Sequence, residues 1–280
     1  GVTQRGHRVC VNRRAMDADR LILVGAVSYH YHAGFGGGRK TLVPGLAARE
    51  TIAYNHSLTL DPDHDRLRPG VEIGKLDGNL VAEEMLDGAR LCDPDIIINT
   101  VLTPGGDLVG LFTGELDAAH RAACRMVEII DRVDLTQTAD FVIASAGGAS
   151  DWVQAHKALF NAHRAIRTGG RVILDAPCPE GLGDERFRTW LRKPDLATLY
   201  RELRQFPEVN GQTALSTRIR GADTILVTKL PETDREDLGI RTAPDMETAV
   251  RMAVRETTVD GRKPTCWFMP EARHTVPFVT

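Results

Sequence analysis

A glycine-rich segment carries the side chains best suited to chemistry. Glycines 34, 36, 37 and 38 stand between two histidines and a lysine, in the run His30-Tyr31-His32-Ala33-Gly34-Phe35-Gly36-Gly37-Gly38-Arg39-Lys40-Thr41. Glycine lets the backbone approach a ligand closely and turn its amide groups toward an anion. An apolar run, Arg20–Val27, precedes the segment, and ligands of open α/β sheets bind beyond the carboxyl ends of strands. We therefore expect a ligand site here rather than a plain flexible loop.

A phosphate-binding loop is one interpretation of this segment. The pattern G-x-x-x-x-G-K-[ST], counted from Gly34, requires a second glycine at position 39, directly before Lys40 and Thr41. Arg39 stands there instead, and its side chain is expected to obstruct a tight wrap around a phosphate. Asp175, at the end of an apolar run, could supply the acidic strand of an NTPase. An NTPase or kinase is therefore the alternative function, with Lys40 as a phosphate-binding cation.

A second interpretation is a family resemblance carried by three separated motifs. The first combines H-Y-x-A-G-F-x-G-G-x-x-K, a V-P-G run that ends at Gly45, and E-T-x-x-x-N-H, which ends at His56. The second is Gly147-Gly148 followed by Gln154 and Lys157, and the third is Thr275-Val276-Pro277. Together these motifs resemble the lactate racemase family of nickel-pincer enzymes over essentially the whole chain. The resemblance implies an isomerase that racemises or epimerises 2-hydroxy acids, and it extends to only the carboxy-terminal two thirds of such an enzyme.

The resemblance also implies the cofactor and the residues that hold it. The cofactor is nickel in a nickel-pincer nucleotide, a pyridinium bisthiocarboxylic acid mononucleotide, and Lys40 matches the lysine that links to it covalently. Gly36, Gly37 and Gly38 complete the cofactor loop. His56 matches the protein ligand of the nickel, and imidazole and sulfur donors both suit that metal. Judged without the resemblance, a single histidine on a helix is more often a hydrogen-bonded core residue.

The remaining site residues are a base and a pair that binds substrate. His30 matches a catalytic acid/base histidine, and an imidazole can exchange a proton near neutrality. His32 either points to another face or modifies the choice of substrate. Gln154 and Lys157 are three residues apart, so they share a helical face, and the family uses this pair to hold the substrate carboxylate. Without the resemblance, the same helix could be an ordinary amphipathic one.

The chemistry implied by the resemblance requires a second base. Removing the C2 proton of a 2-hydroxy acid is difficult because its carboxylate is already negative, whereas removing hydride gives a planar keto acid. Inversion then needs a base on each side of the substrate, and the sequence offers a match to only one of them. The amino-terminal part is missing from this sequence, or a separate polypeptide supplies it, or the lineage has lost racemase activity. In the last case the chain is a non-catalytic cofactor-binding homologue.

The pattern of apolar runs predicts an α/β fold with two domains and mostly parallel sheets, the active site lying in the cleft between them. Alternating strand-like and helix-like segments are typical of this class. The domains are expected at 1–134, the remainder of a cofactor-binding domain, and 135–280. Several strands lack alternation, which predicts cover on both faces. The expected strands are Arg8–Asn12, Arg20–Val27, Asp95–Val101, Leu108–Phe112, Asp140–Ala144, Arg171–Asp175, Thr224–Thr228 and Thr265–Phe268, and the expected helices are Ala47–Leu58, Leu80–Leu91, Leu116–Ile130, Trp152–Arg167, Asp195–Gln205 and Asp245–Glu256.

Composition excludes several classes of partner. A net charge of −3, from 35 basic and 38 acidic residues, provides no basic surface for nucleic acid or membrane lipids. No apolar run has the ~18 residues of a membrane span. The cysteines are scattered and odd in number, which favours a reducing cytoplasm over a disulfide framework. The expected partners are a small 2-hydroxy acid, the cofactor-synthesis proteins and, if it is separate, an amino-terminal segment.

Overall fold

The computed structural model describes residues 1–259 and 261–280, and the chain divides into two compact units. The first unit comprises residues 1–131 and 202–208, and the second comprises residues 132–201 and 209–280. The prediction of an α/β chain with mostly parallel sheets is confirmed, because among the described strands only two pairings, β4 with β5 and β2 with β3, are antiparallel. No helix in the described part of the chain has the length and apolar character needed to cross a membrane.

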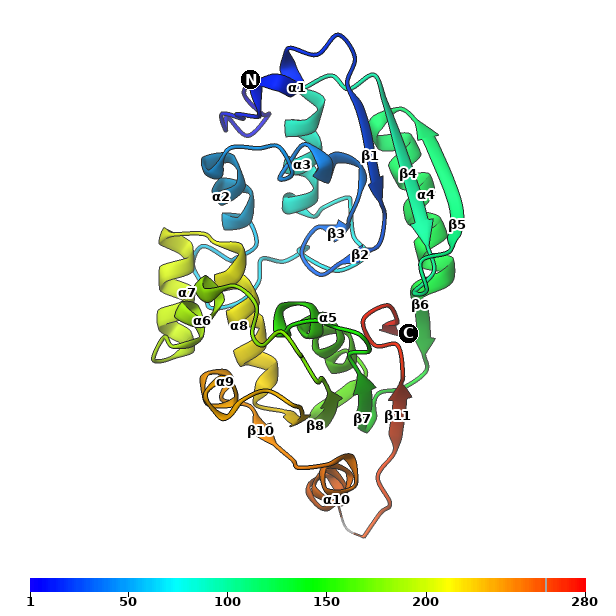
Figure 1. Cartoon of the computed structure of the whole chain (residues 1–280), viewed down its shortest axis with the longest axis vertical. Coiled ribbons are helices and arrows are strands. Elements are labelled where there is room, and N and C mark those ends of the chain that lie inside the picture. Colours follow the sequence, from blue (N-terminus) through cyan, green and yellow to red (C-terminus); the bar gives the residue numbers. More distant parts are fainter. Residues whose placement is uncertain (260) are drawn as a thin grey trace. The chain divides into compact units, whose positions relative to one another are not determined.

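The first unit is built around a three-stranded sheet of order β1-β4-β5, with β1 and β4 parallel. Helix α4 lies against β4 and β5 (Figure 1). A two-stranded hairpin and a short 3-10 helix connect β1 to α2. The elements are α1 Arg13–Met16, β1 Ile22–Ala26, β2 Tyr29–His30, β3 Gly34–Phe35, η1 Gly38–Thr41, α2 Arg49–Ser57, α3 Leu80–Arg90, β4 Ile96–Leu102, β5 Leu108–Gly114 and α4 Leu116–Asp131.

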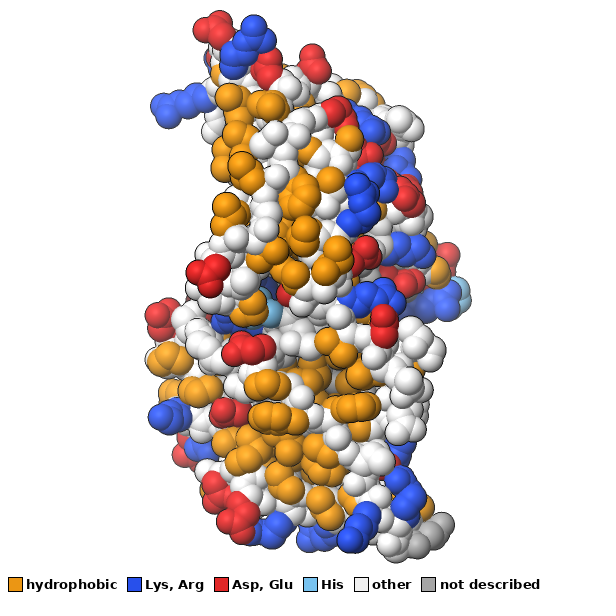
Figure 2. Space-filling view, turned by 90° about the vertical axis from the view of Figure 1, so that its right-hand side faces the viewer, with side chains coloured by type: hydrophobic (Ala, Val, Ile, Leu, Met, Phe, Trp, Pro, Cys, Tyr) orange, Lys and Arg blue, Asp and Glu red, His pale blue; other side chains and the backbone are white. Residues whose placement is uncertain are grey.

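The strands of this sheet are not among those covered on both faces. Burial alternates along β4, as it does on strands with one face in the core. Ile22 and Val24 of β1 and Leu108 and Leu111 of β5 are more than half exposed. Figure 2 faces the side on which β4 and β5 lie in Figure 1, and it shows hydrophobic side chains gathered on the surface of this unit.

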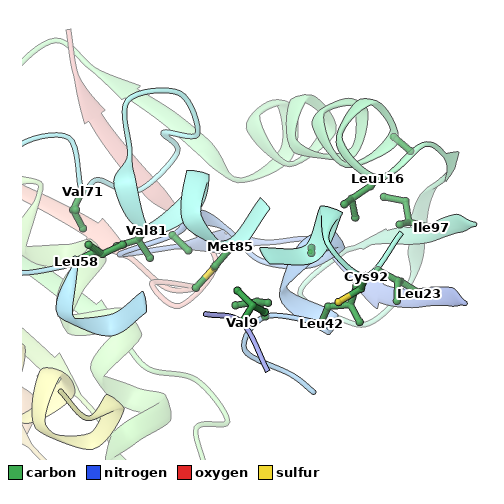
Figure 3. Packing of buried hydrophobic residues seen from close by; sticks show 14 residues of the cluster. Val9, Leu23, Leu42, Leu58, Val71, Val81, Met85, Cys92, Ile97 and Leu116 are labelled. Atoms are coloured by element: carbon green, nitrogen blue, oxygen red, sulfur yellow. The ribbon is translucent and has the colours of Figure 1, made fainter. Parts of the chain in front are cut away.

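The core of the first unit fixes both ends of the glycine loop. Leu42 and Val43 follow the loop directly and have less than 2% of their surface exposed. Figure 3 shows Leu42 beside Val9 and Cys92 in the hydrophobic cluster that also contains Met85 of α3. Burying an aliphatic side chain of this size contributes about 1.5–3 kcal/mol. The loop therefore leaves a rigid strand and re-enters the core immediately after η1.

The second unit has a five-stranded, fully parallel sheet of order β10-β9-β8-β7-β11. Ile173 and Leu174 of β8 point to opposite faces and are both fully buried, so this sheet is covered on both faces. Helix α10 packs on the face that carries Ile173. The elements are β6 Arg132–Leu135, β7 Ala139–Ser145, α5 Trp152–His163, β8 Ile166–Asp175, α6 Glu185–Leu191, α7 Leu196–Gln205, α8 Val209–Gly221, β9 Thr224–Val227, α9 Glu232–Leu238, β10 Arg241–Thr242, α10 Met246–Thr257, β11 Cys266–Met269 and β12 Val276–Val279.

Two of the expected elements need correction. The segment Arg8–Asn12 forms no strand and makes only single bridges, at Arg8 and at Val11. Helix α5 ends at His163 rather than at residue 167, because β8 already begins at Ile166. The helices at residues 185–191, 209–221 and 232–238 were not expected.

Candidate active site

The glycine loop holds Lys40 in a short 3-10 helix just beyond the end of β1. The amide of Gly36 donates to the carbonyl of Ser28 at 2.7 Å, and the amide of Gly45 donates to the carbonyl of Lys40 at 3.0 Å. These two hydrogen bonds lie before and after η1 in the chain. The aliphatic residues after it are anchored in the core, so Lys40 has a backbone position fixed by local contacts.

Three of the loop glycines are required by contacts within the protein itself. Gly34, Gly37 and Gly38 all have φ in the left-handed region, between +50° and +75°. A Cβ on Gly37 would lie 2.6 Å from the Val27 side chain, and one on Gly38 would lie 2.6 Å from the His120 ring. Gly36 differs, because it has no positive φ and its Cβ would meet only Ser28 at an ordinary 3.5 Å. Gly36 is thus the loop glycine whose identity the protein's own packing leaves unexplained.

Replacing Gly34 with Ala is expected to destabilise the chain by about 1–3 kcal/mol, as overpacking does. The new Cβ would lie 2.1 Å from the carbonyl oxygen of Lys75, a backbone atom that cannot rotate away, and φ is +75°. Gly36→Ala is the matched control and should change stability by no more than about 0.5 kcal/mol. Urea unfolding of both variants measures the difference. Equal stabilities would contradict the packing described for the loop.

A buried arginine, Arg39, holds the loop in place through hydrogen bonds. Arg39 is 2% exposed, and its guanidinium donates to the carbonyls of Ala33 at 3.0 Å and Ala82 at 3.2 Å. Its Nη1 also contacts Nδ1 of His120 at 2.9 Å, and Nε2 of His120 donates to the carbonyl of Gly36 at 2.8 Å. Burial lowers the pKa of Arg39 to about 10, so the group stays charged at neutral pH. Burial and the charge of Arg39 lower the pKa of His120 to about 4, so this ring is neutral.

The same contacts argue against the phosphate-loop alternative. A phosphate cradle needs backbone amides that point at the ligand. Here the amide of Gly38 donates to Oδ1 of Asn99 at 3.0 Å, and the amide of Lys40 donates to the carbonyl of Gly37 at 3.0 Å. The side chain at position 39 occupies the interior next to the loop. This loop holds a lysine, and the amides of Gly36, Gly38 and Lys40 are already hydrogen-bonded within the protein.

Lys40 has the electrostatics of a reactive amine. Burial, and then the positive charge of Arg39, lower its pKa to about 8. About a tenth of this lysine is consequently an uncharged amine at pH 7 and about half at pH 8, and the uncharged amine is the nucleophilic form of lysine. The arginine that argues against a phosphate loop is thus a contributor to the reactivity of its neighbour.

His56 lies in the last turn of α2, within electrostatic reach of Lys40. Its Nδ1–H donates to the carbonyl of Ile52 at 2.7 Å, which places the lone pair of the neutral ring on Nε2. Burial lowers its pKa, and the charge of Lys40 lowers it further, so the ring is neutral near pH 7. A neutral imidazole whose other nitrogen donates to a carbonyl is the usual form of a metal-binding histidine. Asn55 fixes the helix by donating to the carbonyl of Val81 at 3.0 Å.

His30 ends the short strand β2, and its ring closes the turn that follows. Its Nδ1 accepts from the amides of His32 at 3.2 Å and Ala33 at 3.1 Å. In this conformation the neutral ring carries its proton on Nε2 and acts there as a hydrogen-bond donor. His32 itself is 5% exposed and buried in the unit.

Gln154 and Lys157 lie on α5 in the second unit, as the helical spacing predicts. Lys157 Nζ donates to Oε1 of Gln154 at 2.9 Å. The amide of Gln154 donates to the Asp151 carboxylate at 2.9 Å, so the start of α5 already has a negative group. Any anion here would depend on side chains.

Sequence reasoning missed the residues that support this site. Arg39 was noticed only as an obstacle to a phosphate loop, and His120 and Asn99 were not noticed at all. Nothing in their local sequence shows that they meet the loop, because they come from α4 and β4, far along the chain. Among residues 1–259 and 261–280, no group of three or more His, Cys, Asp or Glu side chains is arranged to hold a metal ion.

Comparisons with known proteins identify relatives of this chain. Residues 1–67 match the family described as Lactate racemase N-terminal domain. The chain is 31% identical over 196 residues to a lactate racemase of Thermoanaerobacterium thermosaccharolyticum and 33% identical over 190 residues to one of Lactiplantibacillus plantarum. The alignments cover 69% and 67% of this chain but only 45% and 43% of those relatives.

Solved structures extend the likeness to the whole chain. The lactate racemase apoprotein of Thermoanaerobacterium thermosaccharolyticum superposes with a TM-score of 0.88 at 26% identity, over 99% of this chain and 67% of that one. A Thermotoga maritima protein shares the fold alone, with a TM-score of 0.68 at 14% identity over 97% of this chain and 70% of that one. The chain belongs to the lactate racemase family, and it spans less than half the length of the curated relatives it matches.

Proposed function

We propose that this chain is part of an isomerase that racemises or epimerises lactate-like 2-hydroxy acids. The observation that carries the proposal is the pair Lys40 and His56. One is an amine with a lowered pKa, the other is a neutral imidazole with its lone pair on Nε2, and the charge of Lys40 acts on His56. Family membership supplies the reaction class for which such a pair is suited.

These two residues fit the nickel-pincer nucleotide. Lys40 would link covalently to a thiocarboxylate group, and His56 would bind the nickel through Nε2. When bound, the cofactor would accept the hydrogen that leaves C2 of the substrate together with its electron pair. Gly36, which has room for a Cβ yet carries none, would let the backbone lie close to the cofactor, whereas Gly37 and Gly38 would shape the loop. Cofactor-synthesis proteins would be the partners that supply this group.

The chain's own residues would bind the substrate and move its proton. Lys157 and Gln154 would hold the carboxylate, so that C2 is fixed relative to the reacting groups. His30 would exchange a proton with the 2-hydroxyl at Nε2. That exchange requires Nδ1 to give up its two backbone donors and take a proton, so the His30–Ala33 turn would have to shift during catalysis.

Replacing His56 with Ala is expected to remove most of the bound nickel from protein produced with the cofactor-synthesis proteins. The fold should persist, because the hydrogen bond from Nδ1 of His56 ends on the carbonyl of Ile52 in the same helix. Nickel is measured by atomic emission and the fold by circular dichroism. His64→Ala, a histidine on an exposed loop of the same unit, is the control and should retain nickel. Unchanged nickel in His56→Ala would contradict the assignment.

Racemisation is the test of the function itself. A polypeptide that contains this chain, loaded with the cofactor, should convert either enantiomer of a 2-hydroxy acid into an equal mixture, measured by chiral chromatography. Lactate, malate and glycerate are informative substrates, because they differ only at C3. A loaded protein that racemises none of a broad panel of 2-hydroxy acids would overturn the proposal and favour a cofactor-binding role.

A further inference from the structure

The segment after β11 is tied to the same helix that carries Lys157. The amide of Ala272 donates to the carbonyl of Ser145 at 3.2 Å. Asn161 of α5, which is 4% exposed, donates through Nδ2 to the carbonyls of Ala272 at 2.8 Å and Arg273 at 3.4 Å. Figure 1 shows this segment, coloured red, beside α5. A buried amide thus fixes the backbone of Arg273 against the helix.

The attachment point lies on the helical face of the predicted carboxylate-binding pair. Gln154, Lys157 and Asn161 are spaced i, i+3 and i+7, which places them on one side of α5. Lys157 and Asn161 are one turn apart. The hydrogen bonds of Asn161 therefore bring Arg273 to the side of the helix from which Lys157 projects.

Two positive side chains consequently act on one another, and the charge of Asp151 offsets this effect in part by raising the pKa of Lys157. The charge of Arg273 lowers the pKa of Lys157, after the larger effect of burial, and it lowers the pKa of His274 as well. Within the described residues neither Lys157 nor Arg273 forms an ion pair. The Asp151 carboxylate caps α5, where it accepts from the amide of Gln154 and from Oγ of Ser150, both at 2.9 Å. Like charges repel, and an anion bound between them removes that cost.

We propose that Arg273 joins Lys157 and Gln154 in binding the carboxylate of the 2-hydroxy acid, an inference that rests on the proposed function. A guanidinium presents two parallel N–H groups to a carboxylate, so it orients the group as well as attracting it. Lys157 supplies a second cation, and the Gln154 amide contributes a neutral hydrogen bond. This arrangement makes Arg273 a specificity-determining residue for substrates that carry a carboxylate next to C2.

Binding to the 280-residue chain tests this directly, without turnover. Backbone amide spectra are recorded during titration with L-lactate, D-lactate and methyl lactate, the neutral ester. Both lactates should shift amides of the 147–157 and 271–275 segments saturably, and the ester should not. Arg273→Gln should weaken lactate binding about 10-fold or more, as loss of a charge-assisted hydrogen bond does. The lactate affinity of Arg273→Lys should lie between those of the parent chain and Arg273→Gln. Arg255 is an exposed arginine on α10, and Arg255→Gln should bind lactate as the parent chain does.

Each alternative outcome overturns the inference in a recognisable way. Binding that Lys157→Gln weakens and Arg273→Gln leaves unchanged would remove Arg273 from the site while keeping the pair on α5. Equal binding of lactate and its ester, or no saturable binding, would show that these cations do not recognise the carboxylate. A dispersed amide spectrum confirms that each variant is folded. The racemisation assay is independent of this titration, so failure of one is distinguishable from failure of the other.

Discussion

Replacing Lys40 with Ala is expected to abolish covalent attachment of the cofactor and to reduce racemisation to background. The reason is chemical, because Ala has no amine and no other lysine stands in the glycine loop. At pH 8, about half of a lysine with a pKa near 8 is the free amine, whereas less than about 1% of an ordinary lysine is the free amine at that pH. Attachment should therefore already be efficient near pH 8 and should fall as the pH drops below this value.

Intact-mass spectrometry of protein produced with the cofactor-synthesis proteins measures this result. The parent chain should carry an adduct that peptide mapping assigns to Lys40. Lys40→Arg keeps the positive charge without a nucleophilic amine and should also lack the adduct, which separates covalent chemistry from electrostatic attraction. Lys75→Ala removes a surface lysine of the same unit and should leave the adduct unchanged. An adduct that survives Lys40→Ala would remove the assignment.

Replacing Lys157 with Ala is expected to lower kcat/KM by about 10- to 100-fold in a racemisation-competent form of the protein. The lost charge-assisted hydrogen bond is worth about 1.5–3 kcal/mol, and a carboxylate held loosely leaves C2 misplaced relative to the reacting groups. Lys40 and His56 are untouched, so the adduct and the nickel should persist. The pattern to look for is therefore lost turnover with full cofactor loading.

The control for this variant is Lys229→Ala, an exposed lysine of the same unit that should retain full activity. Near-normal turnover of Lys157→Ala on every 2-hydroxy acid tested would show that the carboxylate is held elsewhere. Loss of the cofactor would instead make Lys157 a nucleotide-binding residue. Combining Lys157→Ala with Arg273→Gln measures whether the two cations act on one group, because coupled residues give non-additive effects.

The class of fold could be predicted from the sequence because its signal is local. Apolar runs of strand length and helical periodicity follow one another along the chain. Strands β7 and β9 begin and end close to where these patterns place them, whereas β8 ends as expected but begins at Ile166 rather than at Arg171. Whether a strand is covered on one face or both depends on what packs against it. On β1 and β4 only one face is packed against the core, and the apolar runs of these strands do not show this. The segment Arg8–Asn12 has a strand-like composition but meets no neighbouring strand over its length.

Some residues of the candidate site could also be predicted from the sequence, and others could not. Lys40, His56, Gln154 and Lys157 are recognisable because short motifs with fixed spacing contain them. The spacing does not show that Arg39 turns inward to contact His120, or that its charge lowers the pKa of Lys40. The hydrogen bonds at Nδ1 of His30, which constrain its role as an acid or base, arise from the turn conformation. Arg273 is more than a hundred residues from Lys157, and only the fold brings it to α5.

The fate of the hydrogen at C2 tests the proposed function most directly. L-Lactate is racemised in deuterium oxide by the cofactor-loaded protein, and the D-lactate formed is analysed by mass spectrometry and NMR for deuterium at C2. A hydrogen that leaves with its electron pair and returns does not exchange with solvent, so the product should keep protium at C2. Extensive deuterium at C2 would show that the hydrogen leaves as a proton, and it would contradict the proposed reaction.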